Sequence, residues 1–138
     1  MHATAVAGWT RKGWRSVLLR GPSGAGKSDL AFRLMGRGWR LVGDDYVEVW
    51  ASGNGLFVGP SERIAGLMEV RSLGLVGVRA LCPARAVLLV DCATGPLERL
   101  PEPQTETLEG VRLPRLALDP FETSAPDKTI LALSRALA

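Results

Sequence analysis

Residues 21–28 read GPSGAGKS and decide the fold of this 138-residue chain. They fit the pattern G-x-x-x-x-G-K-[ST], in which glycines let successive backbone N–H groups turn inward around an anion. The segment before them, residues 16–20 (SVLLR), is strand-like, and residues 30–35 after them carry apolar side chains at helical spacing. The order strand, loop, helix is the context that a phosphate-binding loop (P-loop) requires, and it predicts an α/β nucleotide-binding fold.

The P-loop also predicts roles for its own residues. The nucleotide-binding candidates are Gly21, Pro22, Ser23, Gly24, Ala25, Gly26, Lys27 and Ser28. Lys27 would neutralise charge on the outer phosphates, and the Ser28 hydroxyl would ligate magnesium, so ATP and Mg²⁺ are the predicted cofactors. The acceptor stays undefined at this point, because the same loop serves kinases, ATPases, GTPases and nucleotide-sensing modules.

Carboxylates at strand ends are candidates for the remaining chemistry. Residues 40–42 (RLV) read as a strand that delivers Asp44 and Asp45 at its end, and we expect this strand beside the P-loop strand in a parallel sheet. One carboxylate would accept the proton of an attacking hydroxyl, and the other would help to hold magnesium. Asp91 follows the apolar run 86–90 and is an alternative to Asp44 for the metal role.

The remaining segments predict a mixed sheet. Asn54-Gly55 is a turn signal that predicts a hairpin between strands at 47–50 and 56–58. Residues 96–110 are rich in Pro, Glu and Thr and are interpreted as an exposed connection. Apolar positions in residues 127–138 predict a short C-terminal helix.

Composition limits the classes of function. A hydrophobic fraction of 46% with 22% charged residues is globular, and the length suits a single domain over residues 1–138. The net charge of +3 comes from scattered arginines, so no nucleic-acid partner is predicted. No run approaches the roughly 20 apolar residues of a membrane span, and residues 1–7 read as a first strand. Cys82 and Cys92 lack paired spacing and are expected to be reduced, partly buried thiols of a cytoplasmic protein.

Four motifs, taken together, resemble the catalytic domain of the HPr kinase/phosphorylases, a family of bacterial protein-serine kinases. In chain order they are His2, the P-loop, RLVGDD at residues 40–45 and EVRSLG at residues 69–74. The resemblance implies a P-loop domain with a mixed sheet, related to the HPr kinase and phosphoenolpyruvate carboxykinase arrangement. It further implies the short proteobacterial form that lacks an N-terminal domain.

The resemblance also implies roles for the matching residues. Asp45 would accept the proton of the acceptor serine during phosphorylation and return it during phosphorolysis. The magnesium ligands would be Ser28 and Glu69, with Asp44 assisting. The other matching active-site residues would be His2, Lys27 and Arg71.

Two segments depart from the family pattern. Residues 112–115 (RLPR) are the best match to the family's R-x-x-R element and assign Arg112 to the active site, with Arg115 as the alternative. Ser72 stands where the family's E-I-R-G-L-G pattern has glycine, which would affect a close approach of the backbone there.

The predicted function is an ATP-dependent protein-serine kinase for an HPr-type phosphocarrier protein of the phosphotransferase system, which regulates carbohydrate metabolism. Phosphorolysis of the phosphoserine would be the reverse activity, and the resemblance implies a homo-oligomer, a hexamer. A P-loop kinase for a small metabolite is one rival, although it would normally need an arginine-bearing lid on a longer chain. A sensor that binds ATP without transferring phosphate is the other.

Overall fold

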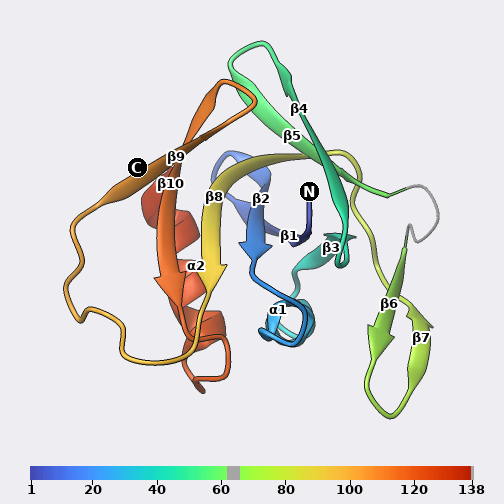
Figure 1. Cartoon of the computed structure of the whole chain (residues 1–138). Coiled ribbons are helices and arrows are strands. Elements are labelled where there is room, and N and C mark those ends of the chain that lie inside the picture. The colour runs from blue at the N-terminus through green and yellow to red at the C-terminus, as the bar shows by residue number, and fades with distance from the viewer. Residues whose placement is uncertain (62–65, 138) are drawn as a thin grey trace.

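The protein is built on a mixed sheet, with helices on one face and a β-hairpin on the other (Figure 1). The computed structural model describes residues 1–61 and 66–137. The strands are β1 (Ala3–Thr10), β2 (Gly13–Arg20), β3 (Arg40–Gly43), β4 (Val47–Ser52), β5 (Gly55–Pro60), β6 (Leu67–Val70), β7 (Gly74–Gly77), β8 (Ala84–Cys92), β9 (Gln104–Leu108) and β10 (Val111–Leu118). The helices are α1 (Lys27–Met35) and α2 (Ala125–Ala136).

The main sheet has the order β3-β1-β2-β8-β10-β9, and β5 of the β4–β5 hairpin also pairs with β8. The β2–β8 and β8–β10 pairs are parallel and the others are antiparallel, so the predicted mixed sheet is confirmed. The expected pairing of the strand at residues 40–42 with the P-loop strand is wrong, because β1 lies between β3 and β2. A tight turn at residues 11–12 joins β1 to β2 and pairs Thr10 with Gly13. β1 therefore occupies the position beside β2 that the strand at residues 40–42 was expected to take.

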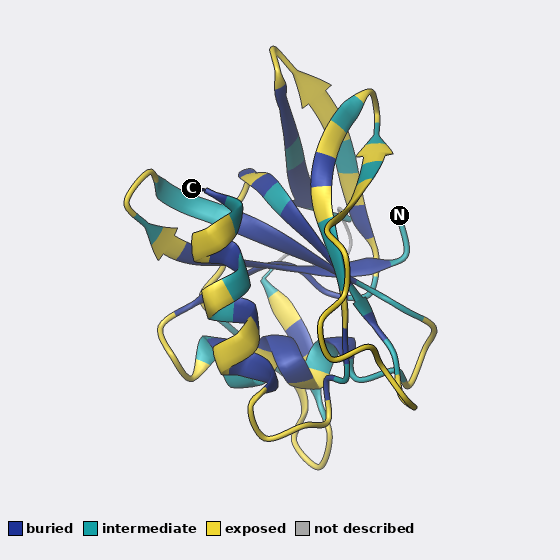
Figure 2. Ribbon diagram, turned by 90° about the vertical axis from the view of Figure 1, so that its left-hand side faces the viewer, coloured by how far each residue is buried: buried dark blue, intermediate teal, exposed yellow. Residues whose placement is uncertain are grey.

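Burial on both faces explains why the central strands are continuous apolar runs (Figure 2). In β2, Val17 and Leu19 pack with the helices, whereas Leu18 packs in the cluster on the hairpin side. Successive side chains of a strand point to opposite faces, so one short run serves both cores. The P-loop strand is thereby fixed at the centre of the molecule.

Two other predicted segments need correction. Residues 96–110 are not wholly a connection, because β9 (Gln104–Leu108) pairs with β10 at the edge of the sheet. Its polar sequence suits an edge strand, most of whose residues are exposed. Cys82 is exposed rather than partly buried, whereas Cys92 is buried and burial raises the pKa of its thiol to about 12.

The hairpin at residues 47–58 and the C-terminal helix are confirmed as β4–β5 and α2; Ala138, the last residue predicted for the helix, lies outside the described residues. The cysteines of the described residues are free. In the part of the chain that the structure describes, neither helix is long and apolar enough to cross a membrane.

Candidate active site

The P-loop connects β2 to α1 in the order that the sequence predicted. Gly24 and Gly26 have φ angles of 81° and 95°, in the left-handed region that glycine adopts without strain. A Cβ atom at Gly26 would lie 2.8 Å from Cγ of Pro120, so only glycine fits there. The Lys27 side chain is buried, and its Nζ atom donates to the carbonyl oxygens of Gly21 (2.7 Å) and Pro22 (3.1 Å).

Asp44 lies next to the start of α1, so the acidic pair is close to the P-loop as predicted. The residue is 6% exposed, and Oδ1 accepts hydrogen bonds from the hydroxyl of Ser28 (2.6 Å) and from that of Thr4 (3.0 Å). Thr4 Oγ1 also accepts a hydrogen bond from the backbone N–H of Asp45 (3.1 Å). Thr4 thus holds both acidic residues in place.

Thr4 was missed by the sequence analysis. It is fully buried in β1, and β1 is the direct neighbour of the strand that carries the acidic pair. The available signal is a threonine within the otherwise apolar stretch of residues 3–8. The threonine can be linked to the acidic pair only once it is known that β3 pairs with β1.

Asp45 is the second acidic residue, and its backbone has a φ angle of 67°. Such a conformation is costly for a residue with a side chain and concentrates at functional sites. Its Oδ1 atom lies 3.0 Å from Nε2 of His2, whose ring stacks on Tyr46 with centroids 4.9 Å apart. Tyr46 was also missed; the structure brings it to His2 because Met1 and Val47 exchange backbone hydrogen bonds.

A cavity of about 540 Å³ opens in front of the loop and is called the P-loop cavity. It brings together most of the predicted site: Ser23, Gly24, Gly26, Lys27, Ser28, Asp44, Asp45, Glu69 and Arg71. Glu69 comes from β6, and Arg71 and Ser72 from the turn that follows it. Ser72 has a φ angle of 74°, so this position suits the glycine of the family pattern better than it suits serine.

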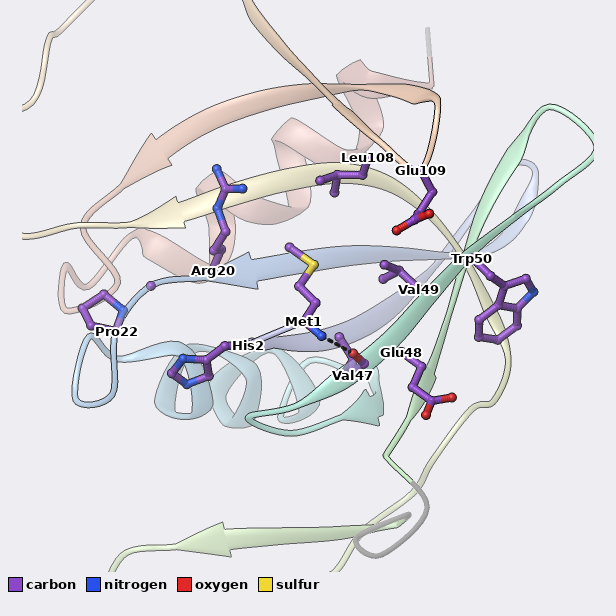
Figure 3. A pocket seen from close by; sticks show the side chains of 11 residues that line it. Met1, His2, Arg20, Pro22, Val47, Glu48, Val49, Trp50, Leu108 and Glu109 are labelled. Atoms are coloured by element: carbon purple, nitrogen blue, oxygen red, sulfur yellow. Dashed lines mark hydrogen bonds between the residues drawn. The ribbon is translucent and has the colours of Figure 1, made fainter.

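A larger cavity of about 1100 Å³, called the trough, lies between β4 and the β9–β10 turn (Figure 3). His2 and Pro22 lie at one end of the trough and Trp50 at the other (Figure 3). His2 lines the trough, whereas Asp45 lines the P-loop cavity. The contact between His2 and Asp45 therefore joins a residue that lines the trough to a residue that lines the P-loop cavity.

Asp91, the alternative to Asp44 for the metal, belongs to an ion-pair cluster with Arg20, Glu106 and Arg115. It accepts hydrogen bonds from Arg20 (2.8 and 3.3 Å) and from Arg115 (2.6 Å). Burial acts to raise the pKa of Asp91, but these hydrogen bonds outweigh it and the pKa lies below its ordinary value. The same two arginines also pair with Glu106, and the hydrogen bond from Arg20 lowers the pKa of Glu106.

Of the two arginines of the R-x-x-R match, Arg115 is in this cluster. Arg112 is exposed on β10 opposite Thr107 and lines neither cavity.

The residues that could help to hold a metal ion lie at the start of α1 and at the end of β3. Among the described residues no three His, Cys, Asp or Glu side chains are grouped to hold an ion by themselves. The Ser28–Asp44 pair does offer the oxygen donors that Mg²⁺ prefers, and this ion is usually held by one or two carboxylates plus substrate phosphates.

The fold and site define a P-loop domain with an acidic pair beside the phosphate-binding loop. The model of the family "HPr Serine kinase C-terminal domain" matches residues 14–90, more than half of the chain. The chain belongs to this family, as its four motifs indicated. The HPr kinase family uses ATP, typically with Mg²⁺.

Curated relatives agree with this assignment. The HPr kinase/phosphorylase of Exiguobacterium sibiricum is 44% identical over 72 residues, which are 51% of this chain and 23% of that protein. The HPr kinase/phosphorylase of Limosilactobacillus reuteri is 36% identical over 115 residues, 74% of this chain and 36% of that protein. The matched part is thus a quarter to about a third of the length of these relatives.

A solved structure supports the fold. The structure of the Hpr(Ser) kinase/phosphatase from Coxiella burnetii matches 99% of this chain and 90% of that chain, with a TM-score of 0.80. Its sequence identity is 22%, so the match shows that the two chains share a fold.

Proposed function

We propose that this domain is an ATP-dependent protein-serine kinase whose acceptor is an HPr-type phosphocarrier protein. The observation that carries the proposal is the contact between Asp45, which lines the P-loop cavity, and His2, which lines the trough. A nucleotide in the first and an acceptor in the second would meet at the Asp45 carboxylate. The names of the relatives supply the class of acceptor.

The P-loop residues account for nucleotide binding in this proposal. The backbone N–H groups of the loop and the Lys27 ammonium bind the phosphates, and Arg71 adds positive charge from the β6–β7 turn. Ser28 and Asp44 would hold Mg²⁺, with Glu69 as a further ligand from the same cavity; the ion neutralises charge on the phosphates.

Asp45 acts as the general base in the transfer step. Its carboxylate accepts the proton of the serine hydroxyl while the serine oxygen bonds to the γ-phosphorus and the bond to the β-phosphate oxygen breaks. The products are phosphoserine and ADP. His2, itself stacked on Tyr46, orients the carboxylate through the 3.0 Å contact. In the reverse direction, protonated Asp45 would give its proton to the departing serine oxygen as inorganic phosphate attacks, which yields pyrophosphate.

The shape of the acceptor side favours a protein over a small metabolite. The trough is about twice as large as the P-loop cavity and lies open between two hairpins. Kinases for small metabolites enclose the acceptor under a lid that excludes water. An open trough suits a segment on the surface of another protein.

The test is transfer of phosphate from ATP labelled at the γ-position to a purified HPr-type carrier, with mass spectrometry to locate the label. We expect a labelled serine with the wild type and none with Lys27→Ala. Lys12→Ala is the matched control, because Lys12 is exposed in the β1–β2 turn. ATP binding without a labelled serine would contradict the kinase and support the sensor; transfer to small hydroxyl compounds would support the metabolite kinase.

A further inference from the structure

Two phenylalanines line the P-loop cavity and have no part in the proposed transfer step. Phe32 is 45% exposed and Phe121 is 57% exposed, and both contribute to the wall of the cavity. We propose that they form an aromatic platform on which the nucleobase of the bound nucleotide stacks. This inference rests on the proposed function, which places a nucleotide in the same cavity.

Phe32 projects from the helix that begins at the loop. It follows Ser28 by four residues, and side chains at this spacing lie on the same face of a helix. The face of α1 that presents Ser28 to the phosphates therefore also presents Phe32, one turn further on. A nucleotide held at Ser28 has this ring beside it.

Phe121 lies directly against the loop from the other side. Its Cζ atom is 3.1 Å from the point that a Cβ of Gly26 would occupy, so the absence of a side chain at Gly26 makes room for the ring. The turn after β10 carries Phe121 to this position. Two aromatic side chains from separate elements thus flank one phosphate-binding loop.

The turn that carries Phe121 is fixed by α1. Arg33 donates hydrogen bonds to the carbonyl oxygens of Pro120 and Glu122 (3.2 Å for Glu122), and Asp29 holds Arg33 through a 3.0 Å ion pair. The backbone N–H of Phe121 donates to the Asp119 carboxylate at 2.9 Å. The backbone that carries the ring is therefore held in position before any ligand arrives, which lowers the entropic cost of stacking.

Of the four carboxylates that the described chain contributes to the cavity, three are already paired, which favours stacking over recognition of the base edge. Asp29 is paired with Arg33, Asp44 with Ser28, and Asp45 with His2. Among the described residues, no asparagine or glutamine lines the cavity, and these are the side chains whose amide offers a donor and an acceptor together. Aromatic stacking tolerates any base, so ATP and GTP should bind with affinities within about tenfold of each other.

The experiment compares Mg²⁺–ATP, Mg²⁺–GTP and Mg²⁺–tripolyphosphate by titration calorimetry. Tripolyphosphate supplies the phosphates without a base. We expect the wild type to bind ATP at least about fivefold more tightly than tripolyphosphate, and GTP about as well as ATP. Phe121→Ala should weaken ATP to near the tripolyphosphate affinity while tripolyphosphate binding stays unchanged, and Phe121→Tyr should restore ATP.

Controls separate the platform from the fold and from the proposed function. Trp9→Ala removes an exposed aromatic ring on β1 (71% exposed) that lines neither cavity, and it should change nothing. An unchanged ATP-to-tripolyphosphate ratio in both Phe121→Ala and Phe32→Ala would overturn the platform and leave the kinase standing. Equal loss of both ligands in Phe121→Ala would overturn it too, because the loop itself would then be disturbed. Failure of the wild type to bind any of the ligands would overturn the nucleotide site itself.

Discussion

Replacing Asp91 by asparagine tests whether the Asp91 carboxylate has a structural or a catalytic role. The Asp91 side chain is 22% exposed and accepts three hydrogen bonds from Arg20 and Arg115. A hydrogen bond to a charged group contributes about 1.5–3 kcal/mol. Glu106 continues to hold both arginines in the variant, and the cluster is partly exposed to water, so the net loss is smaller than the sum. We expect a loss of about 1–3 kcal/mol, which lowers Tm by about 3–9 °C.

The assay is thermal unfolding followed by circular dichroism, with Mg²⁺-dependent transfer measured on the same samples. Asp127→Asn is the control, because Asp127 is exposed and its 3.4 Å ion pair with Arg37 should contribute less than about 1 kcal/mol. Asp91→Asn should keep transfer within about tenfold of the wild type, whereas Asp44→Asn should lose at least about a hundredfold. An unchanged Tm together with abolished transfer in Asp91→Asn would refute the reasoning and return the metal role to Asp91.

Three further predictions follow from the backbone and from the ion pairs. The pKa values of Asp91 and Glu106 lie below their ordinary values in the folded chain, so the stability they contribute is present above about pH 4.5 and is lost progressively as the pH falls below about 4. The difference between the urea midpoints of the wild type and Asp91→Asn should therefore shrink as the pH falls from about 6 to about 3, and a constant difference would contradict this. Ser72→Gly should relieve the strain of a φ of 74° and raise the free energy of unfolding by up to about 1 kcal/mol, measured by urea unfolding. A lower free energy of unfolding would show that the Ser72 side chain makes a stabilising contact. Gly26→Ala places a Cβ atom 2.8 Å from Pro120 at a residue whose φ is 95°. We expect it to destabilise the fold by about 2–4 kcal/mol and to abolish ATP binding measured by calorimetry. An alanine variant that binds ATP normally would contradict the close packing at this turn.

The elements that sequence could predict are those with local signals. The P-loop, α1, the β4–β5 hairpin and α2 each carry their own glycine, turn or periodic pattern, and the structure has them where these patterns indicated. The order of the strands has no local signal, because it depends on which of several apolar strands pairs with β2. For that reason the insertion of β1 between β2 and β3 was not predicted.

The same cause limited prediction of the site. The structure brings His2, Ser28, Asp44 and Asp45 together, and sequence reasoning had selected all of them through the motifs. Thr4 was missed because its role comes from the pairing of β1 with β3. Stacking of one aromatic ring on another, as between Tyr46 and His2, likewise depends on a contact between two segments. Residues in a motif can be selected from sequence, whereas the residues that hold them need the fold.

The central claim is that Asp45 is the general base of the transfer step. Single-turnover transfer to the HPr-type carrier by Asp45→Asn tests it most directly. ATP affinity is measured separately on the same variant, with Asp127→Asn as the matched control. The account predicts that Asp45→Asn binds Mg²⁺–ATP within about threefold of the wild type and transfers phosphate at least about a hundredfold more slowly. A variant that binds ATP and transfers phosphate to the carrier serine at close to the wild-type rate would contradict it.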